Sequence, residues 1–293
     1  MISIQFTKLV DCLNELEKTT KKLEKIEILK EFLKTVDANE VSSICRLITA
    51  KLFLPWEGEF LGVAEKMVIK VISKAMNVKI PAIIDQQRKT GDLGVTIELF
   101  AQKKIKTGTL LEALGVQLQS LTVKKVFNSL QNIARITGEG SVNRKQDIIV
   151  NLLAVASPIE AKFIVRIVLG DLRIGVAELS LLDALGETYL TSKEEKKLLD
   201  HKFNIHPDIG HIAYLLSKEG KKGLDKISIG TGIPIRTMAA QRLSKPEEIL
   251  EKLGDSCAIE WKYDGERVQA HVDPNKISLF SCLLNKYLLF YYK

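Results

Sequence analysis

The sequence predicts a mainly α-helical fold, followed near the end of the chain by a small α+β piece with antiparallel strands. Aromatic residues make up only 6% of the 293 residues, while Leu, Ile, Val, Lys and Glu dominate, and this composition favours helices over a β-sandwich. Apolar residues recur with a helical period up to about residue 220, after which alternation with a period of two replaces it. We therefore expect an all-helical domain over residues 1–220 and an α+β domain over residues 221–293.

The first helices follow from the spacing of apolar residues. The stretches Phe6 to Leu16 and Leu23 to Leu33 each place their apolar side chains on one helical face. The segment Leu54-Pro55-Trp56-Glu57-Gly58 interrupts the pattern, and Met67 to Met76 predicts another buried helix. The segment Thr90-Gly91-Asp92-Leu93-Gly94 then predicts a turn.

Capping residues mark the helices in the middle of the chain. Thr122 can cap a helix whose apolar face extends from Val123 to Ala134, and Gly138-Glu139-Gly140-Ser141 separates it from the next helix. The segment Ser157-Pro158-Ile159-Glu160 is a capping box with proline at the first helical position. Gly170 can end this helix in the left-handed conformation, and the segment from Leu169 to Gly175 is a second glycine-bracketed turn.

Beyond residue 220, glycines and a proline form a loop-like segment, and short strands follow. The strands that we predict are Cys257 to Lys262, Arg267 to Val272 and Ile277 to Phe280. Asp264-Gly265 is a turn between the first two, and Asp273-Pro274-Asn275 is a turn before the third. In the second strand, alternation predicts that Val268, Ala270 and Val272 form the buried face.

Charge and cysteine content narrow the class of protein. The formal net charge is +7 and the sequence pI is near 9.0. From charge alone, a polyanionic partner such as nucleic acid and a soluble protein that happens to be basic are equally good interpretations. The four cysteines are far apart, with no CxxC pair, which predicts a reduced protein without a metal site. Because no secretory signal and no membrane-spanning apolar run is visible, we expect a cytoplasmic protein that has no membrane partner.

The segment Lys262-Tyr263-Asp264-Gly265 carries candidate chemistry. A neutral lysine amine attacks phosphorus well, so Lys262 can displace pyrophosphate from ATP and retain AMP as a phosphoramide. Glu260 lies on the same strand face as Lys262 and is placed to accept a hydrogen bond from adenine. Arg267 is placed to hold ribose or phosphate oxygens, and Gly265 permits a close backbone approach. A Lys-x-Asp-Gly pattern alone arises by chance in about one in ten chains of this size, as an ordinary hairpin turn.

The surrounding residues make the pattern specific. Residues 260–271 closely resemble the active-site segment of archaeal and eukaryotic ATP-dependent DNA ligases, and the sequence looks archaeal. Residues 232–242 resemble the segment that leads into that family's adenylation domain, although Thr237 and Ala239 stand where the family has Pro and Leu. The resemblance extends from residue 1 to about residue 280. In the helical part it rests on residues 91–94, 121–123, 138–141, 160–162 and 172–175.

The resemblance implies a function and a set of site residues. It implies nick sealing in duplex DNA during replication, repair and recombination, with ATP and Mg²⁺, a monomeric state and a sliding clamp as a partner. Lys262 would be the adenylated residue, and Glu260, Asp264, Gly265 and Arg267 would bind the nucleotide. The helical domain would hold nicked duplex DNA through helix N-termini and glycine turns, for which the candidates are Gly138, Gly140, Ser141, Arg144, Lys145, Lys162, Arg166, Arg173 and Gly175. The alternatives are plain helix stops for the glycines and a solvated face for the cations.

The end of the chain departs from the family pattern. An adenylation domain needs roughly another 130 residues to close its core, so the α+β piece is expected to be incomplete and the chain to be a truncated form. Residues 282–293 are apolar and aromatic where the family continues with arginines, and the alternative is a natural C-terminal strand or helix. The competing functions are an active ligase and a non-catalytic DNA-binding fragment of one. The related RNA ligases and capping enzymes rank lower because they lack the helical domain.

Overall fold

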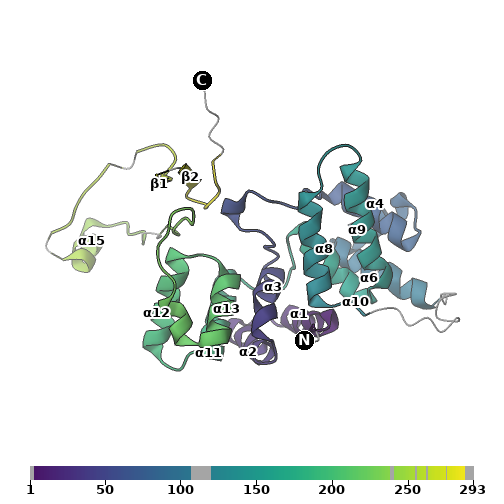
Figure 1. Cartoon of the computed structure of the whole chain (residues 1–293), viewed down its shortest axis with the longest axis horizontal. Helices are drawn as coiled ribbons and strands as arrows, with labels where there is room; N and C mark the ends of the chain where they lie inside the picture. The colour runs from purple at the N-terminus through teal and green to yellow at the C-terminus, as the bar shows by residue number, and fades with distance from the viewer. Residues whose placement is uncertain are drawn as a thin grey trace, which may run out of the picture.

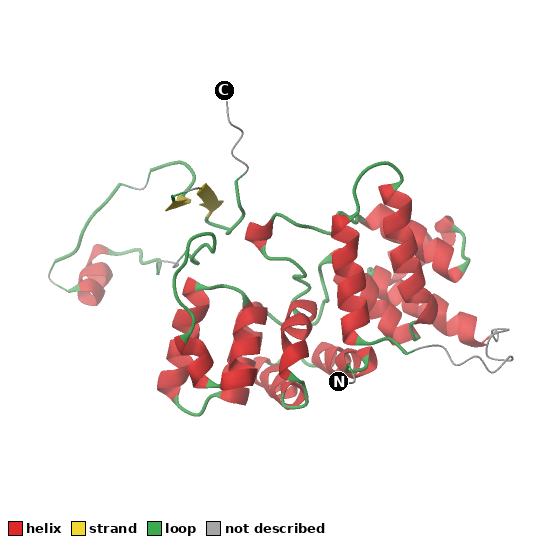
Figure 2. Cartoon of the chain, in the orientation of Figure 1, coloured by secondary structure: helices red, strands yellow, loops and turns green. Residues whose placement is uncertain are grey.

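The computed structural model describes residues 3–106, 120–237, 241–254, 256–261, 263–274 and 276–287, and most of them are helical (Figure 2). The strands in this part of the chain are β1 (Val268–Asp273) and β2 (Lys276–Ser281), which form an antiparallel pair. The mainly α fold with a small α+β piece is therefore confirmed. None of the helices described is both long and apolar enough to cross a bilayer.

The helices begin and end at the predicted cap residues. The Thr122 side chain accepts a hydrogen bond from the Lys125 amide, and Ser157 and Glu160 form the predicted capping box. Gly170 ends its helix with φ of 78°, in the left-handed region. The helices are α1 (Phe6–Lys18), α2 (Lys22–Leu33), α3 (Ala38–Ile48), α4 (Glu65–Met76), α5 (Ile80–Thr90), α6 (Leu93–Lys106), α8 (Val123–Arg135), α9 (Ser141–Val155), α10 (Pro158–Leu169), α11 (Glu178–Tyr189), α12 (Lys193–Ile205), α13 (Ile209–Glu219), α14 (Lys221–Asp225) and α15 (Pro246–Leu253), with a short 3-10 turn η1 (Pro55–Glu57).

The helices form two groups that meet at α1 (Figure 1). One group contains α4, α5, α6, α8, α9 and α10, in which α6 packs on α10 and α4 packs on α9. The other group contains α2, α3, α11, α12, α13 and α14, in which α3 packs on α13 and α2 packs on α11. The two groups are joined into one helical body through α1, which contacts α2, α8 and α10, and through α3, which packs on α8.

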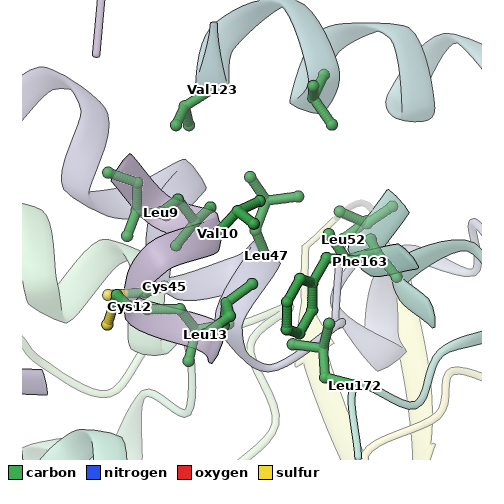
Figure 3. Close-up of a cluster of buried hydrophobic side chains, with 14 of the residues drawn as sticks. Leu9, Val10, Cys12, Leu13, Cys45, Leu47, Leu52, Val123, Phe163 and Leu172 are labelled. Atoms are coloured by element: carbon green, nitrogen blue, oxygen red, sulfur yellow. The ribbon is translucent and has the colours of Figure 1, made fainter. Parts of the chain in front are cut away.

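The core of this body lies where α1 meets helices from both groups (Figure 3). Leu9 and Leu13 of α1 are fully buried, together with Val123 of α8 and Phe163 of α10. Removing such apolar surface from water is the main driving force for the packing. All four cysteines are free thiols, as the sequence predicts, and Cys12 is among the residues that fill this core.

The helical body continues past residue 220, where the sequence places a boundary. Leu224 of α14 is fully buried and Ile227 is 2% exposed, and both belong to the helical core. Farther along, the Arg236 amide donates to the Asn204 carbonyl at 2.8 Å, and the Arg236 guanidinium lies 4.6 Å from the centre of the Phe203 ring. The segment after α14 is thus attached to the end of α12.

The two-stranded sheet differs from the sequence prediction in two respects. Residues 257–261, predicted as a strand, form no strand, and they lie in an irregular segment. The face predicted to be buried, with Val268 and Val272, is exposed, and Gln269 and His271 lie on the sheltered face. The reason is local hydrogen bonding. Gln269 exchanges two bonds with the Ile235 backbone, and His271 Nδ1 accepts from the Gly232 amide at 3.0 Å.

Candidate functional site

The N-terminus of α9 has the form that the sequence predicts. Gly138 and Gly140 adopt left-handed φ values of 82° and 71°, and Ser141 is the first helical residue. No side chain caps this end, and its first turn contains no acidic residue. In the described part of the chain, no group accepts a hydrogen bond from the amides of Val142 or Asn143. Free amides at a helix N-terminus are a ready site for an anion.

Two cations, Arg144 and Lys145, lie at the end of the first turn and the start of the second. Arg144 is exposed and donates from Nη2 to the Thr137 carbonyl at 2.8 Å, so its guanidinium lies over the loop that precedes the helix. Lys145 is half-buried and donates from Nζ to the Leu61 carbonyl at 3.1 Å. Positive charge at the positive end of a helix dipole is unfavourable in the free protein. A bound anion would remove that penalty, so the arrangement suits a polyanionic ligand.

The turn from Gly170 to Gly175 forms a second candidate contact. Arg173 has φ of 55°, which is uncommon for a residue with a side chain, and its amide donates to Asp171 Oδ1 at 2.9 Å. Its Nη1 donates to the Gly91 carbonyl at 2.7 Å, and about half of the side chain is exposed. Two glycine turns that are about 80 residues apart in the sequence thus lie side by side, with an accessible guanidinium between them.

Arg166 lies beneath these two turns, and here the structure corrects the sequence. Its side chain is 3% exposed, with Nη2 2.7 Å from Asp92 Oδ2 and 2.9 Å from Glu17 Oε1. Its Nη1 donates to the Leu172 carbonyl at 3.1 Å. Burial raises the pKa of Asp92, but the bonds from Arg166 outweigh burial and hold that pKa below its ordinary value. The prediction of a direct phosphate contact for Arg166 is therefore wrong, because the guanidinium is enclosed and paired.

Lys162, like Arg166, is buried and paired with an acidic residue. Its side chain is 9% exposed and its Nζ lies 2.6 Å from Glu17 Oε2. Like Arg166, it joins α10 to α1 within the protein and presents little of its charge to solvent. Glu17 consequently receives both cations, and its pKa is lowered because their hydrogen bonds outweigh the effect of burial.

Lys25 is a buried cation that the sequence reasoning missed. Its Nζ donates to the Ile174 carbonyl at 2.7 Å and to the Gly175 carbonyl at 3.0 Å. Together with the bond from Arg166 to Leu172, these contacts hold three carbonyls of the turn against buried cations. A side chain at Gly175 would place its Cβ 2.6 Å from the Lys25 amine, so glycine fits there on steric grounds as well as through its positive φ. No sequence signal distinguishes Lys25 from the solvent-facing lysines of the same helix.

The nucleotide-binding candidates are placed differently. Lys262 lies outside the residues that the structure describes. Glu260, Asp264, Gly265 and Arg267 are all exposed, and no described residue pairs with their side chains. The structure does not bring Glu260 and Arg267 together around a pocket. Nor do the described residues contain a cluster of three acidic, histidine or cysteine side chains that would suit a metal ion.

Comparison with known proteins agrees with both parts of the chain. Residues 5–186 match the family model described as DNA ligase N terminus, and residues 237–291 match the ATP dependent DNA ligase domain. The DNA ligase of Nitrosopumilus maritimus is 38% identical over 98% of this chain and 48% of that protein. DNA ligase 2 of Thermofilum pendens is 39% identical over 95% of this chain and 46% of that protein. The DNA ligase of Sulfurisphaera tokodaii is 37% identical, with the same shares covered.

The chain thus spans about half the length of these relatives. The first family model alone covers more than half of the chain, and the second begins directly after Arg236, at the end of the segment that attaches to α12. The chain belongs to the family of ATP-dependent DNA ligases.

Proposed function

We propose that this chain holds duplex DNA and carries the adenylated lysine of a nick-sealing DNA ligase. The observation that carries the DNA-binding part is the N-terminus of α9, where free amides and two cations lie together and the first turn of the helix contains no acidic residue. Phosphate groups satisfy these amides and cations at once. Contacts of this kind depend on the backbone and not on base identity, as an enzyme that acts at any nick requires.

The turn from Gly170 to Gly175 supplies the second DNA contact in this proposal. Arg173 is the cation that reaches phosphate, and the buried pairs beneath it fix the turn. Arg166 and Lys162 act through this turn and through α10, as positioning residues. The DNA contacts that we propose are therefore Gly138, Gly140, Ser141, Arg144, Lys145, Arg173 and Gly175.

Lys262 supplies the chemistry that the family resemblance implies. Its amine attacks the α-phosphorus of ATP and forms a P–N bond, while the bond to pyrophosphate breaks and the amine loses a proton. The AMP then passes to the 5′-phosphate of a nick, and the 3′-hydroxyl attacks that phosphate and releases AMP. We assign adenine recognition to Glu260 and ribose or phosphate contact to Arg267. No described set of side chains suits Mg²⁺, so no residue is assigned to the metal.

A second candidate is a DNA-binding protein that does not itself seal nicks. The observation that favours it is the exposure of Glu260, Asp264 and Arg267, which form no pocket together. Both candidates predict the same DNA contacts, so only nucleotide transfer separates them. In either case we expect a cytoplasmic monomer, with a sliding clamp as a partner at the level of the family.

Incubation with α-labelled ATP and Mg²⁺ separates the two candidates. The ligase proposal predicts label on the denatured wild-type protein and none on Lys262→Ala, since only the wild type has the nucleophile. An unlabelled wild type would reject the ligase proposal and favour the DNA-binding protein that does not seal nicks. Binding to a nicked duplex across a salt series tests the part that both share. Affinity should fall steeply as salt rises, and a flat response would contradict both.

A further inference from the structure

The outer face of α8 is a surface that neither the sequence motifs nor the proposed contacts include. Its inner face is anchored in the core, because Val123, Val126, Leu130 and Ile133 are fully buried. The opposite face is therefore fixed in orientation. The side chains exposed on it are all cationic or amide groups, namely Lys124, Lys125, Asn128, Asn132 and Arg135. We call these five residues the α8 face.

The charge of this face is not neutralised within the protein. Of the helices that the structure describes, α8 is the one whose sequence contains neither Asp nor Glu. Elsewhere, exposed lysines often pair with an acid one turn away, as Lys18 does with Glu15 and Lys34 does with Glu31. In contrast, the cations of the α8 face make no ion pair with any described residue. The helix itself therefore offers a polyanion no acidic competitor, and the nearby carboxylates are Asp37 and Glu40, which line a neighbouring pocket with Lys124 and Asn128.

The same face is hollowed and lined by polar side chains. A shallow depression is formed by Thr122, Lys124, Lys125, Asn128, Ser129 and Asn132. These side chains supply ammonium, amide and hydroxyl donors. Lys, Asn, Ser and Thr are the residue types that contact phosphate and sugar oxygens in protein–DNA complexes. The chemistry of the lining thus fits a phosphodiester strand.

The α8 face is also continuous with the first proposed DNA contact. Residues 136–140 connect the end of α8 directly to the N-terminus of α9, and the two helices pack side by side (Figure 1). A helix of 13 residues is about 20 Å long, which is enough to follow several phosphates of one strand. A strand bound at Arg144 can therefore extend along α8 without leaving the protein surface.

We propose that the α8 face is an additional duplex-binding surface, along which the phosphate backbone runs between the N-terminus of α8 and the N-terminus of α9. This inference rests on the proposed function, since it extends the DNA contacts beyond the two glycine turns. It adds Lys124, Lys125 and Arg135 as phosphate-binding cations, and Asn128 and Asn132 as neutral donors. None of the five is needed for the core, so they can be changed without unfolding α8.

The test compares two triple variants of the full chain that lose the same charge. One is Lys124→Gln, Lys125→Gln and Arg135→Gln, and the other is Lys193→Gln, Lys197→Gln and Lys222→Gln. The control residues are exposed and lie on α12 and α14, in the other helix group (Figure 1). Binding to a fluorescent 30-base-pair nicked duplex is measured by anisotropy between about 50 and 300 mM salt. Thermal unfolding verifies that both variants are folded.

The α8 variant should bind at least about tenfold more weakly at 150 mM salt. Its plot of log affinity against log salt should become shallower by about 0.9 for each phosphate that the variant no longer neutralises. The control should stay within about twofold of the wild type, and the charge-conserving double variant Lys124→Arg, Lys125→Arg should keep the wild-type slope. Equal effects of the two triple variants would overturn the α8 proposal while leaving the proposed function intact. A wild type that fails to bind the duplex, or binds it without salt dependence, would reject the proposed function itself.

Discussion

Arg166 connects three separated segments of the chain through one side chain. It bonds Asp92 before α6, Glu17 at the end of α1 and the Leu172 carbonyl in the turn after α10, to which it is itself attached. A single buried guanidinium can do this because it has five donors in a fixed plane. Lysine cannot reproduce the geometry, since its donors radiate from one nitrogen.

Replacing Arg166 with Leu should destabilise the protein strongly. The change leaves Asp92 buried without its main partner, and loss of one member of a buried ion pair costs about 3–5 kcal/mol. Arg166→Lys should recover only part of this loss. Urea unfolding followed by circular dichroism measures both variants. A loss below about 1 kcal/mol for Arg166→Leu would show that the network contributes little.

The four thiols should fall into two classes. Burial raises the pKa of Cys12 to about 12, with Glu15 adding to the effect, and burial also raises the pKa of Cys45. Both are enclosed in the core, whereas Cys257 is half-buried and Cys282 is exposed. A thiol reagent at pH 8 should therefore modify Cys257 and Cys282 quickly, and all four thiols after denaturation. Fast modification of Cys12 or Cys45 in the native protein would contradict this core packing.

At the level of single elements, a change at the N-terminus of α9 should have opposite effects on the stability of the free protein and on its affinity for duplex DNA. Asn143 is exposed in the first turn, so Asn143→Asp places a negative charge near the positive end of the helix dipole. The change should stabilise the free protein by about 0.5 kcal/mol and weaken duplex binding at the same time. Asn204→Asp, an exposed site near the C-terminal end of α12 in the other helix group, is the control with equal charge. Urea unfolding and anisotropy measure the two effects, and equal loss of binding in both variants would argue against a contact at the N-terminus.

The junction of α12 and α13 should respond to pH. The ring of His206 stacks on His211 at 4.8 Å, and no described group bonds its buried Nδ1. Burial lowers the pKa of His206, His211 lowers it further, and Asp208 opposes the shift. A lowered folded pKa means that the unfolded chain binds the proton first, as pH falls below the ordinary value of 6.5.

The neutral His206 side chain therefore makes its full contribution to the free energy of unfolding above pH 6.5, and this contribution is lost as the pH falls below that value. We expect the free energy of unfolding to be lower at about pH 5.5 than at about pH 7.5, with a smaller difference in His206→Gln. Urea titrations at the two pH values measure this. An identical pH dependence in the variant would assign the effect to other groups.

The elements that sequence predicts well are those with strong local signals. Helices such as α8 and α10 begin at Thr122 and Ser157 because their caps act within one turn of the chain. The orientation of β1 was predicted wrongly, because alternation identifies two faces but not which of them is sheltered. The bonds from Gln269 and His271 to residues 232–235 decide it, and they join segments more than 30 residues apart.

In the candidate site too, features set by local sequence could be predicted, and features set by contacts between distant segments could not. The glycine turns at residues 138–141 and 170–175 could be located from the sequence, since left-handed residues require glycine or a rare exception such as Arg173. Arg166 was assigned to DNA because an arginine on a helix looks the same in sequence whether it is buried or exposed. Only the partners, Asp92 and Glu17, reveal that its charge is used internally.

At the scale of the whole molecule, the helical body should function without the residues that follow it. Its core ends at Ile227, and Arg236 is the last residue of the segment attached to α12. The proposed DNA contacts on α8, α9 and the turn after α10 all lie before that point. A protein of residues 1–236 should therefore unfold cooperatively and keep the salt slope of duplex binding shown by the full chain, because every phosphate-binding cation remains. It should never acquire label from ATP, because it lacks Lys262. Circular dichroism melts, anisotropy and labelling measure the three properties in one preparation. A folded fragment that has lost duplex binding would show that residues after 236 supply the DNA contacts, which would contradict the assignment of DNA binding to the helical body.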